Sequence, residues 1–446
     1  MIQKNEAYEV EITGMTEEGD GVGRIGGQAI FIPYTLPGEV VRALAVKVNK
    51  HYAYGKMLEV VRPSRHRCKA ECPYFYQCGG CSLWHMDYAA ELAFKQHKVE
   101  DCLRRIGKLD VPVSAIVGCE DRRYYRNKAQ FPVMPEGIGF YKKRSHTVID
   151  MNDCLIQKPF NACILQCVRE WMKAFSVSAY DEKTHTGVIR HIYTRCGESG
   201  VLVCLVTRTA ELPHGADLVR RLCALDIPVV GIVQNINPKR TNVILGDDSK
   251  TLYGADKVVD RIGPVQFQIS PRSFYQVNRA QTEKLYQIAM EFAGLTGKET
   301  VWDLYCGIGT IGQFMARQAK RIVGVEIVQD AVDNARENAA LNGITNAVYF
   351  CGAAEKLAPD LLEKGLRPDV VVLDPPRKGC DESLLQTVVQ CQPKRIVYIS
   401  CKPSTLARDA RILDQSGYAA VSAVPCDLFP ATHHVETVCL LSKTEK

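Results

Sequence analysis

Several features are missing from this 446-residue sequence. No uninterrupted apolar run approaches the roughly 18 residues of a membrane-spanning helix. The segment from Met1 to Tyr8 lacks the apolar core of a secretion signal. Internal repeats and low-complexity linkers are also absent, and the net charge is only +6 at pH 7. We therefore expect a cytoplasmic protein of two or three globular domains without a membrane contact, in which any polyanionic partner is bound by local clusters of charge.

Cysteine, in contrast, is abundant. Nineteen cysteines would indicate disulfides in a small secreted domain, but this chain is long and has no export signal. Reduced thiols are the better interpretation, and some of them are expected to serve as metal or cluster ligands.

The first 62 residues alternate between apolar and polar side chains and are divided by glycine-rich turns, which predicts a small closed barrel. Three of its segments, Gly19-Asp-Gly-Val-Gly-Arg24, Phe31-Ile-Pro33 and Pro37-Gly-Glu-Val40, resemble the TRAM domain, an OB-like barrel associated with RNA binding. The resemblance implies an RNA-binding barrel over residues 1–62. A barrel used only for packing is the alternative.

A dense cysteine segment follows, Cys72-Pro-Tyr-Phe-Tyr-Gln-Cys78-Gly-Gly-Cys81. All-thiolate sites hold zinc or iron–sulfur clusters, and zinc would use the local set that Cys68 completes. The spacing also resembles the cluster loop of TRAM-containing uracil methyltransferases. That resemblance implies a [4Fe–4S] cluster whose fourth ligand is the distant Cys154, so that the metal ligands are Cys72, Cys78, Cys81 and Cys154. Zinc or inert thiols remain the alternatives.

Residues 63–264 are expected to form a central α+β domain. Leu92 to Ile106 reads as an amphipathic helix, and Asp121–Lys128 combines four positive charges with two tyrosines. Cations neutralise phosphates and aromatic rings stack on unpaired bases, so this segment predicts RNA contact. The basic run Tyr141–His146 extends that character. A solvated charged face is the alternative.

From residue 265 to 446, helices alternate with buried strands, which predicts an α/β domain with a parallel sheet. Val301–Thr310 is a strand that runs into a glycine-rich turn, and Arg321–Ile327 is a second strand that ends in an acidic residue. The spacing does not fit the phosphate-binding glycine fingerprint. It resembles motif I of S-adenosylmethionine-dependent methyltransferases, which implies a Rossmann-like class I methyltransferase domain.

Two further strands end in reactive side chains. Asp369–Leu373 is followed by Asp374-Pro-Pro-Arg377, and Arg395–Ser400 is followed by Cys401. Parallel strands place such residues at the carboxyl edge of the sheet, where ligands bind. A helix that begins near Pro403, together with Lys402, would lower the pKa of the Cys401 thiol, which makes it a candidate nucleophile. An inert buried thiol is the alternative.

Five motifs together resemble the RNA (uracil-5-)-methyltransferase family: Ser273-Phe-Tyr-Gln-Val-Asn278, Asp303-Leu-Tyr-Cys-Gly-Ile-Gly309, Asp374-Pro-Pro-Arg377, Ser400-Cys-Lys-Pro403 and His434-Val-Glu-Thr437. With the TRAM and cysteine segments, the resemblance spans nearly the whole chain. It implies Cys401 as nucleophile and Glu436 as general base. It also implies S-adenosylmethionine ligands at Gln276, Tyr305, Thr310, Glu326 and Asp374.

The implied reaction begins when the thiolate adds to carbon 6 of uracil, which makes carbon 5 able to accept a methyl group. Glu436 then removes the carbon 5 proton; a surface carboxylate is its alternative role. We expect 5-methyluridine formation in RNA by a monomer, with ribosomal RNA favoured over transfer RNA, and an unpaired or flipped target uridine. The alternatives are an amino-group or cytosine methyltransferase and a non-catalytic, cluster-bearing RNA-binding protein.

Overall fold

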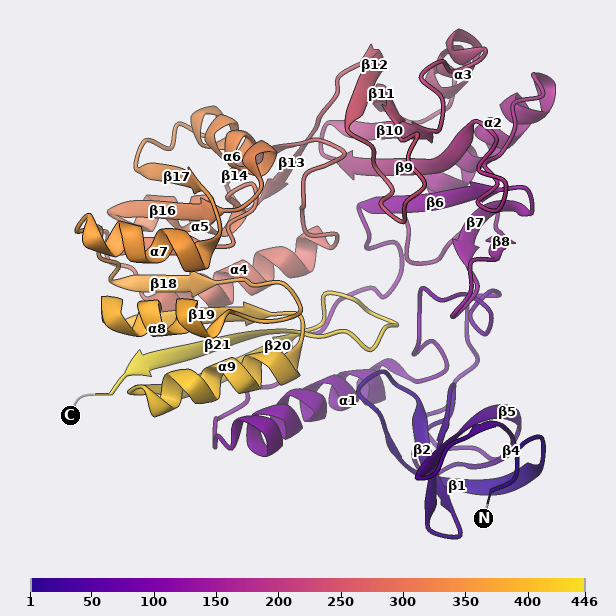
Figure 1. Cartoon of the computed structure of the whole chain (residues 1–446), viewed down its shortest axis with the longest axis horizontal. Coiled ribbons are helices and arrows are strands. Elements are labelled where there is room, and N and C mark those ends of the chain that lie inside the picture. The colour runs from indigo at the N-terminus through magenta and orange to yellow at the C-terminus, as the bar shows by residue number, and fades with distance from the viewer. Residues whose placement is uncertain (1, 445–446) are drawn as a thin grey trace.

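The computed structural model describes residues 2–444. Figure 1 shows an N-terminal barrel, a central domain built on a seven-stranded sheet, and a C-terminal domain built on a second seven-stranded sheet. None of the helices in the described part of the chain is long and apolar enough to cross a membrane.

The barrel consists of five strands in the order β1-β2-β3-β5-β4. Their bounds are β1 (Ala7–Met15), β2 (Gly21–Ile25), β3 (Gln28–Ile32), β4 (Val40–Val48) and β5 (Tyr52–Arg62). Every second side chain faces the interior, as Val10 and Ile12 do on β1. Gly23 allows β1 and β2 to approach, because a Cβ atom there would lie 2.3 Å from Val10 Cγ1. The predicted closed barrel is confirmed.

Helix α1 (Tyr88–Asp101) continues into the π-helix η1 (Cys102–Gly107). It begins one turn before the predicted Leu92, because the side chain of Asp87 accepts a hydrogen bond from Ala90 N and caps the helix. Although α1 lies in the segment expected to be central, Val99, Cys102 and Leu103 are buried in the core of the C-terminal domain.

The central sheet has the order β12-β11-β10-β9-β6-β7-β8. Its strands are β6 (Lys128–Met134), β7 (Gly137–Tyr141), β8 (Val148–Asp150), β9 (Ile189–Gly197), β10 (Gly200–Thr207), β11 (Val229–Ile236) and β12 (Asp248–Gly254). Helices α2 (Phe160–Ala174) and α3 (Gly215–Cys223) pack on it and share one apolar core with it. A hairpin of β13 (Val258–Ile262) and β14 (Val265–Ile269) follows, and the predicted boundary at residue 264 falls in its turn.

The C-terminal sheet has the order β17-β16-β15-β18-β19-β21-β20, in which the first five strands are parallel. Its strands are β15 (Thr300–Leu304), β16 (Arg321–Glu326), β17 (Ala347–Cys351), β18 (Val370–Leu373), β19 (Arg395–Ser400), β20 (Tyr418–Cys426) and β21 (Glu436–Lys443). The strand order reverses between β15 and β18, where open α/β sheets bind ligands.

Helices cover both faces of this sheet. They are α4 (Arg279–Ala293), α5 (Thr310–Met315), the 3-10 turn η2 (Ala316–Gln318), α6 (Gln329–Leu341), α7 (Ala354–Glu363), α8 (Glu382–Cys391) and α9 (Pro403–Gln415). Successive strand residues face opposite cores: Trp302 packs with α7, α8 and α9, whereas Val301 packs with α4 and α5. The predicted class I methyltransferase architecture is confirmed.

Candidate active site and cysteine cavity

Four neighbouring parallel strands end in residues that the sequence singled out. Tyr305 follows β15, Glu326 ends β16, Asp374 follows β18 and Cys401 follows β19. Because these strands run in the same direction, their carboxyl ends form one edge of the sheet and present these side chains together.

The glycine turn between β15 and α5 is held by two carboxylates. Asp303 Oδ2 accepts a hydrogen bond from Gly312 N at 2.8 Å, and Glu326 Oε2 accepts one from Gly307 N at 3.1 Å. Tyr305 and Gly307 both have positive φ, at 67° and 54°. A left-handed tyrosine is uncommon and indicates a turn that its surroundings hold in place.

Two other residues were predicted to bind S-adenosylmethionine, Thr310 directly after this turn and Gln276 further from it in the chain. Thr310 is the first residue of α5, and its hydroxyl is 2.8 Å from the hydroxyl of Tyr286 on α4. Gln276 is buried in the segment that joins β14 to α4, where its backbone carbonyl accepts a hydrogen bond from Asn127 Nδ2 at 3.0 Å. Gln276 therefore ties the C-terminal domain to the central one.

The antiparallel pairing of β21 with β19 brings Glu436 next to Cys401, because Thr437 pairs with Ser400. Both carboxylates near the thiol are hard to ionise: burial raises the pKa of Glu436 to about 8 and that of Asp374 to about 7. Glu436 is only 4% exposed, so the alternative of a surface carboxylate is wrong. A carboxyl with this pKa can exchange protons near neutral pH.

The predicted lowering of the Cys401 pKa is wrong. Burial, followed by the charges of Glu436 and Asp374, raises the pKa of this thiol to about 11, and Arg377 opposes the rise. The sequence had indicated Lys402, but its side chain is exposed and is not among the main causes of the shift.

Arg377 is a residue to which the sequence had assigned no role in the chemistry. Its guanidinium lies close enough to Cys401 to lower the pKa of that thiol, and its Nη2 lies 3.3 Å from Nε2 of His434. Its position directly after Asp374-Pro-Pro, at the end of a buried strand, is the signal by which it could have been found.

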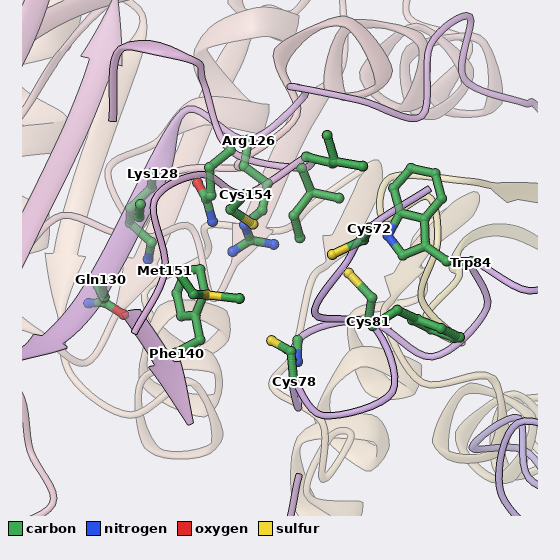
Figure 2. Close-up of a pocket in the computed structure, with 16 residues that line it drawn as sticks. Cys72, Cys78, Cys81, Trp84, Arg126, Lys128, Gln130, Phe140, Met151 and Cys154 are labelled. Atoms are coloured by element: carbon green, nitrogen blue, oxygen red, sulfur yellow. The ribbon is translucent and has the colours of Figure 1, made fainter. Parts of the chain in front are cut away.

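Four cysteines line one cavity of about 230 Å³ between the cysteine segment and the central sheet. Figure 2 shows the sulfur atoms of Cys72, Cys78, Cys81 and Cys154 around this space. Cys68 does not line it; its thiol donates a hydrogen bond to the carbonyl of Trp84 at 3.4 Å. The structure thus assembles the set that includes the distant cysteine and leaves out the local one.

Within residues 2–444, no group of three or more Cys, His, Asp or Glu side chains is placed to hold a metal ion. Thiolates are the ligands of both zinc and iron–sulfur sites, so the identity of these side chains does not choose between the two.

The basic segment Asp121–Lys128 faces inward more than the sequence indicated. Arg122 donates a hydrogen bond to the buried Glu91 at 2.7 Å, and Tyr125 is buried with its hydroxyl bound to the carbonyl of Pro430. Arg126 and Lys128 line the cysteine cavity. Most of these side chains are therefore used inside the protein, and only Asp121 and Arg123 of the segment are well exposed.

Known proteins resemble the chain over nearly its whole length. The family model for tRNA (Uracil-5-)-methyltransferase matches residues 87–444, and the TRAM domain model matches residues 3–58. An uncharacterized RNA methyltransferase of Halalkalibacterium halodurans is 48% identical over 447 residues, 99% of this chain and 98% of that protein. One of Listeria innocua is 46% identical over 448 residues, 99% of either chain.

A solved structure shares the fold as well. Pyrococcus abyssi tRNA (uracil-54, C5)-methyltransferase in complex with S-adenosyl-L-homocysteine matches with a TM-score of 0.81 and 26% identity, over 97% of this chain and 100% of that chain. The chain belongs to the tRNA (uracil-5-)-methyltransferase family and is an S-adenosylmethionine-dependent RNA methyltransferase.

Proposed function

We propose that this protein forms 5-methyluridine in RNA through a covalent bond between Cys401 and the target uracil. The observation that carries the proposal is the meeting of Cys401, Glu436 and Asp374 at the sheet edge next to the glycine turn. Membership of an enzyme family argues against the alternative of a non-catalytic RNA-binding protein.

The reaction uses Cys401 and Glu436 in turn. The Cys401 thiolate adds to carbon 6, so that an S–C bond forms and the double bond between carbons 5 and 6 becomes an enolate. Carbon 5 of that enolate would form a bond to the methyl group of S-adenosylmethionine, while the bond between that methyl group and the sulfonium sulfur breaks and leaves a neutral thioether. The Glu436 carboxylate then removes the carbon 5 proton, the double bond reforms, and the S–C bond breaks to release the thiolate. Arg377 supports the thiolate electrostatically.

S-adenosylmethionine supplies a methyl group on a positively charged sulfur, and the sheet edge fits such a ligand. A Cβ atom added at Gly307 would meet nothing within 4 Å, so the space above the turn is open. Ile327, directly after Glu326, exposes 66% of its apolar side chain at this edge, which suits contact with a planar ring. We assign cofactor binding to Gln276, Tyr305, Thr310, Glu326 and Asp374.

The cysteine cavity is proposed to hold a [4Fe–4S] cluster on Cys72, Cys78, Cys81 and Cys154. Thiolates are the usual ligands of such clusters, and the thiols converge on a cavity that is otherwise lined mainly by apolar side chains such as Trp84 and Met151. The cluster would supply a cross-link between the cysteine segment and the central domain, or a redox-active group.

For the substrate we propose ribosomal RNA, because the TRAM barrel and the cysteine segment together resemble the ribosomal RNA branch of the family. Transfer RNA is the second candidate. It is favoured by the Pyrococcus abyssi protein of similar fold, whose name specifies a transfer RNA uracil. The target uridine has to leave its stack to reach Cys401 in either case.

The test uses ribosomal and transfer RNA isolated from cells that lack this protein. Each fraction is incubated with the purified enzyme and S-adenosylmethionine, and its nucleosides are identified by mass spectrometry. We expect 5-methyluridine in the ribosomal fraction; its appearance in transfer RNA alone would select the second candidate. Methylated cytidine or an amino-methylated base in place of 5-methyluridine would overturn the proposal.

The covalent step has its own test. RNA from cells grown with 5-fluorouracil carries a fluorine in place of the carbon 5 hydrogen, so the adduct cannot resolve by proton removal. We expect a denaturant-stable protein–RNA complex with the wild-type enzyme and none with Cys401→Ala. An undiminished complex in the variant would show that another nucleophile is used.

A further inference from the structure

The segment between β20 and β21, residues 427–435, leads directly into Glu436; we call it the β20–β21 connection. Side chains and backbone amides from elsewhere in the chain hold its backbone. Five consecutive backbone carbonyls, from Asp427 to Ala431, accept hydrogen bonds from outside the connection. The side chains of Gln281, Asn278, Lys95 and Tyr125 donate to residues 427, 428, 429 and 430 in that order, and the backbone amides of Ser82 and Leu83 donate to Ala431. The connection has a turn of its own, in which Thr432 donates hydrogen bonds to the carbonyl of Phe429, but most of its carbonyls are held from outside.

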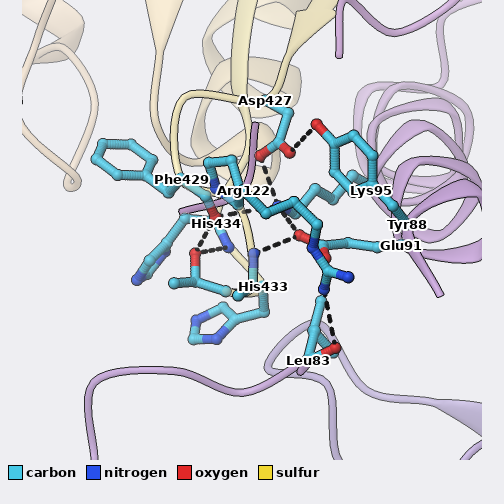
Figure 3. A network of polar contacts seen from close by, with 12 residues as sticks. Leu83, Tyr88, Glu91, Lys95, Arg122, Asp427, Phe429, His433 and His434 are labelled. Carbon is cyan, nitrogen blue, oxygen red and sulfur yellow. Dashed lines mark hydrogen bonds and ion pairs between the residues drawn. The ribbon is translucent and has the colours of Figure 1, made fainter. Parts of the chain in front are cut away.

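A buried charge network around Glu91 and Lys95 of α1 supports this connection (Figure 3). Lys95 Nζ donates hydrogen bonds to Glu91 at 2.7 Å and to Asp427 at 2.6 Å, and all three side chains are completely buried. Arg122 donates to Glu91 at 2.7 Å, and the hydroxyl of Tyr88 donates to Asp427 at 2.8 Å. Two cations and two anions balance one another, so loss of one partner leaves a buried charge without compensation.

The backbone conformation of Ala431 shows what the charge network stabilises. Its φ is 65°, in the left-handed region that side chains other than glycine rarely adopt. Such a conformation persists only where the surroundings enforce it. Here Ala431 N donates a hydrogen bond to Glu91 Oε1 at 2.8 Å, while Ser82 and Leu83 hold its carbonyl from the other side.

The residues directly after Ala431 reach the reaction site. Glu436 follows as the first residue of β21, and the pairing of β21 with β19 places it next to Cys401. The backbone that α1 fixes at Ala431 therefore sets where β21 begins and so where the proposed base lies.

We propose that Glu91 and Lys95 are positioning residues of the methyl-transfer reaction, which act by setting the β20–β21 connection so that Glu436 meets the carbon 5 proton. This inference rests on the proposed role of Glu436. It predicts that disturbance of the network slows the resolution of the covalent intermediate rather than RNA binding or adduct formation.

A matched control is present in the barrel. Glu39 is also completely buried, accepts a hydrogen bond from a backbone amide, Leu36 N, at 2.9 Å, and pairs with a cation, Arg67. It has no contact with the β20–β21 connection. Glu39→Gln and Glu91→Gln therefore make the same chemical change at the same burial, and only the second touches the connection.

The experiment follows the denaturant-stable complex over time in a single turnover, with RNA from cells that lack the protein and with Glu436→Gln as reference. We expect Glu436→Gln to accumulate the complex. Glu91→Gln should form it at the wild-type rate but resolve it about ten- to a hundredfold more slowly, because small displacements of a catalytic group cost that much. Its RNA affinity should be unchanged, and Glu39→Gln should behave as wild type.

Equal resolution rates in Glu91→Gln and wild type, or equal slowing in Glu39→Gln, would overturn the positioning role and leave the proposed function intact. If neither wild type nor Glu436→Gln forms the complex, the positioning role and the proposed function are both overturned. If Glu91→Gln does not fold, Tyr88→Phe takes its place, because it removes the hydroxyl that donates a hydrogen bond to Asp427. This variant has to show the same slowed resolution in weaker form, and an unchanged rate overturns the proposal.

Discussion

Cys401 and Glu436 come to lie side by side although the first follows a parallel strand and the second begins an antiparallel one. The pairing of Ser400 with Thr437 across the β19–β21 ladder fixes this relationship. The charge of Glu436 raises the pKa of Cys401, and burial raises the pKa of both side chains. Four experiments follow from this arrangement and from the cysteine cavity.

The first prediction concerns the cation that supports the Cys401 thiolate. Arg377→Met should raise the thiol pKa further above about 11 and slow alkylation of Cys401 at pH 8 several-fold, since reactivity follows the thiolate fraction. Lys402→Met is the matched control and should leave the rate unchanged. Peptide mass spectrometry after timed exposure to iodoacetamide measures both; equal effects would contradict the assignment.

The second prediction concerns the pH dependence of the reaction. Glu436 acts in its ionised form, and its pKa is about 8, so the rate at which the covalent complex resolves should rise between pH 6 and 8 and then level off. The rate at which the complex forms depends on the Cys401 thiolate and should continue to rise above pH 9. Rapid-quench measurements separate the two steps, and identical profiles would refute the assignment.

The third prediction concerns stability. The pKa of Glu436 is raised on folding, so the folded chain retains a proton that the unfolded chain has lost between the ordinary glutamate pKa of about 4.3 and pH 8. Stability from this group is therefore complete below that window and decreases as pH rises through it, by at most ~1.4 kcal/mol per pH unit.

Glu436→Gln removes this titration while keeping the shape of the side chain. The thermal midpoint of the variant relative to wild type should increase from pH 5 to 8 and stay constant above. Asp303, whose pKa is also raised, remains in both proteins and cancels in the comparison. A difference independent of pH would mean that Glu436 is already ionised in the folded protein.

The fourth prediction distinguishes the cysteines. Cys154→Ser removes a thiol that lines the cavity, whereas Cys68→Ser removes one that does not. After anaerobic purification, we expect the second variant to retain the iron and sulfide content and the visible absorbance of wild type, and the first to lose most of both. Loss in the Cys68 variant alone would favour the local set of ligands.

Much of the fold could be predicted, because short-range patterns determine it. Alternation in residues 1–62 specified the barrel, and the buried runs that end in Asp374 and Cys401 specified parallel strands whose ends meet. Glu436 was found by resemblance rather than by pattern, because no local signal predicts that β21, the strand that carries it, pairs with β19.

The charged residues were harder to interpret. Glu91 and Lys95, four residues apart on α1, read as an ordinary exposed pair on a helix surface. Only the fold reveals that Asp427 and Arg122 complete a closed network around them. The inward-facing side chains of the basic segment Asp121–Lys128 were not predicted for the same reason, because a sequence does not indicate which cations are neutralised within the protein.

Lys95 and Asp427 are separated by 332 positions in the chain. During synthesis the helix that carries Lys95 and Glu91 leaves the ribosome long before Asp427 exists, so the network is completed only when the final strands are made. A nascent or C-terminally shortened chain is therefore expected to be inactive, and an isolated 265–446 fragment would lack the clamp from α1.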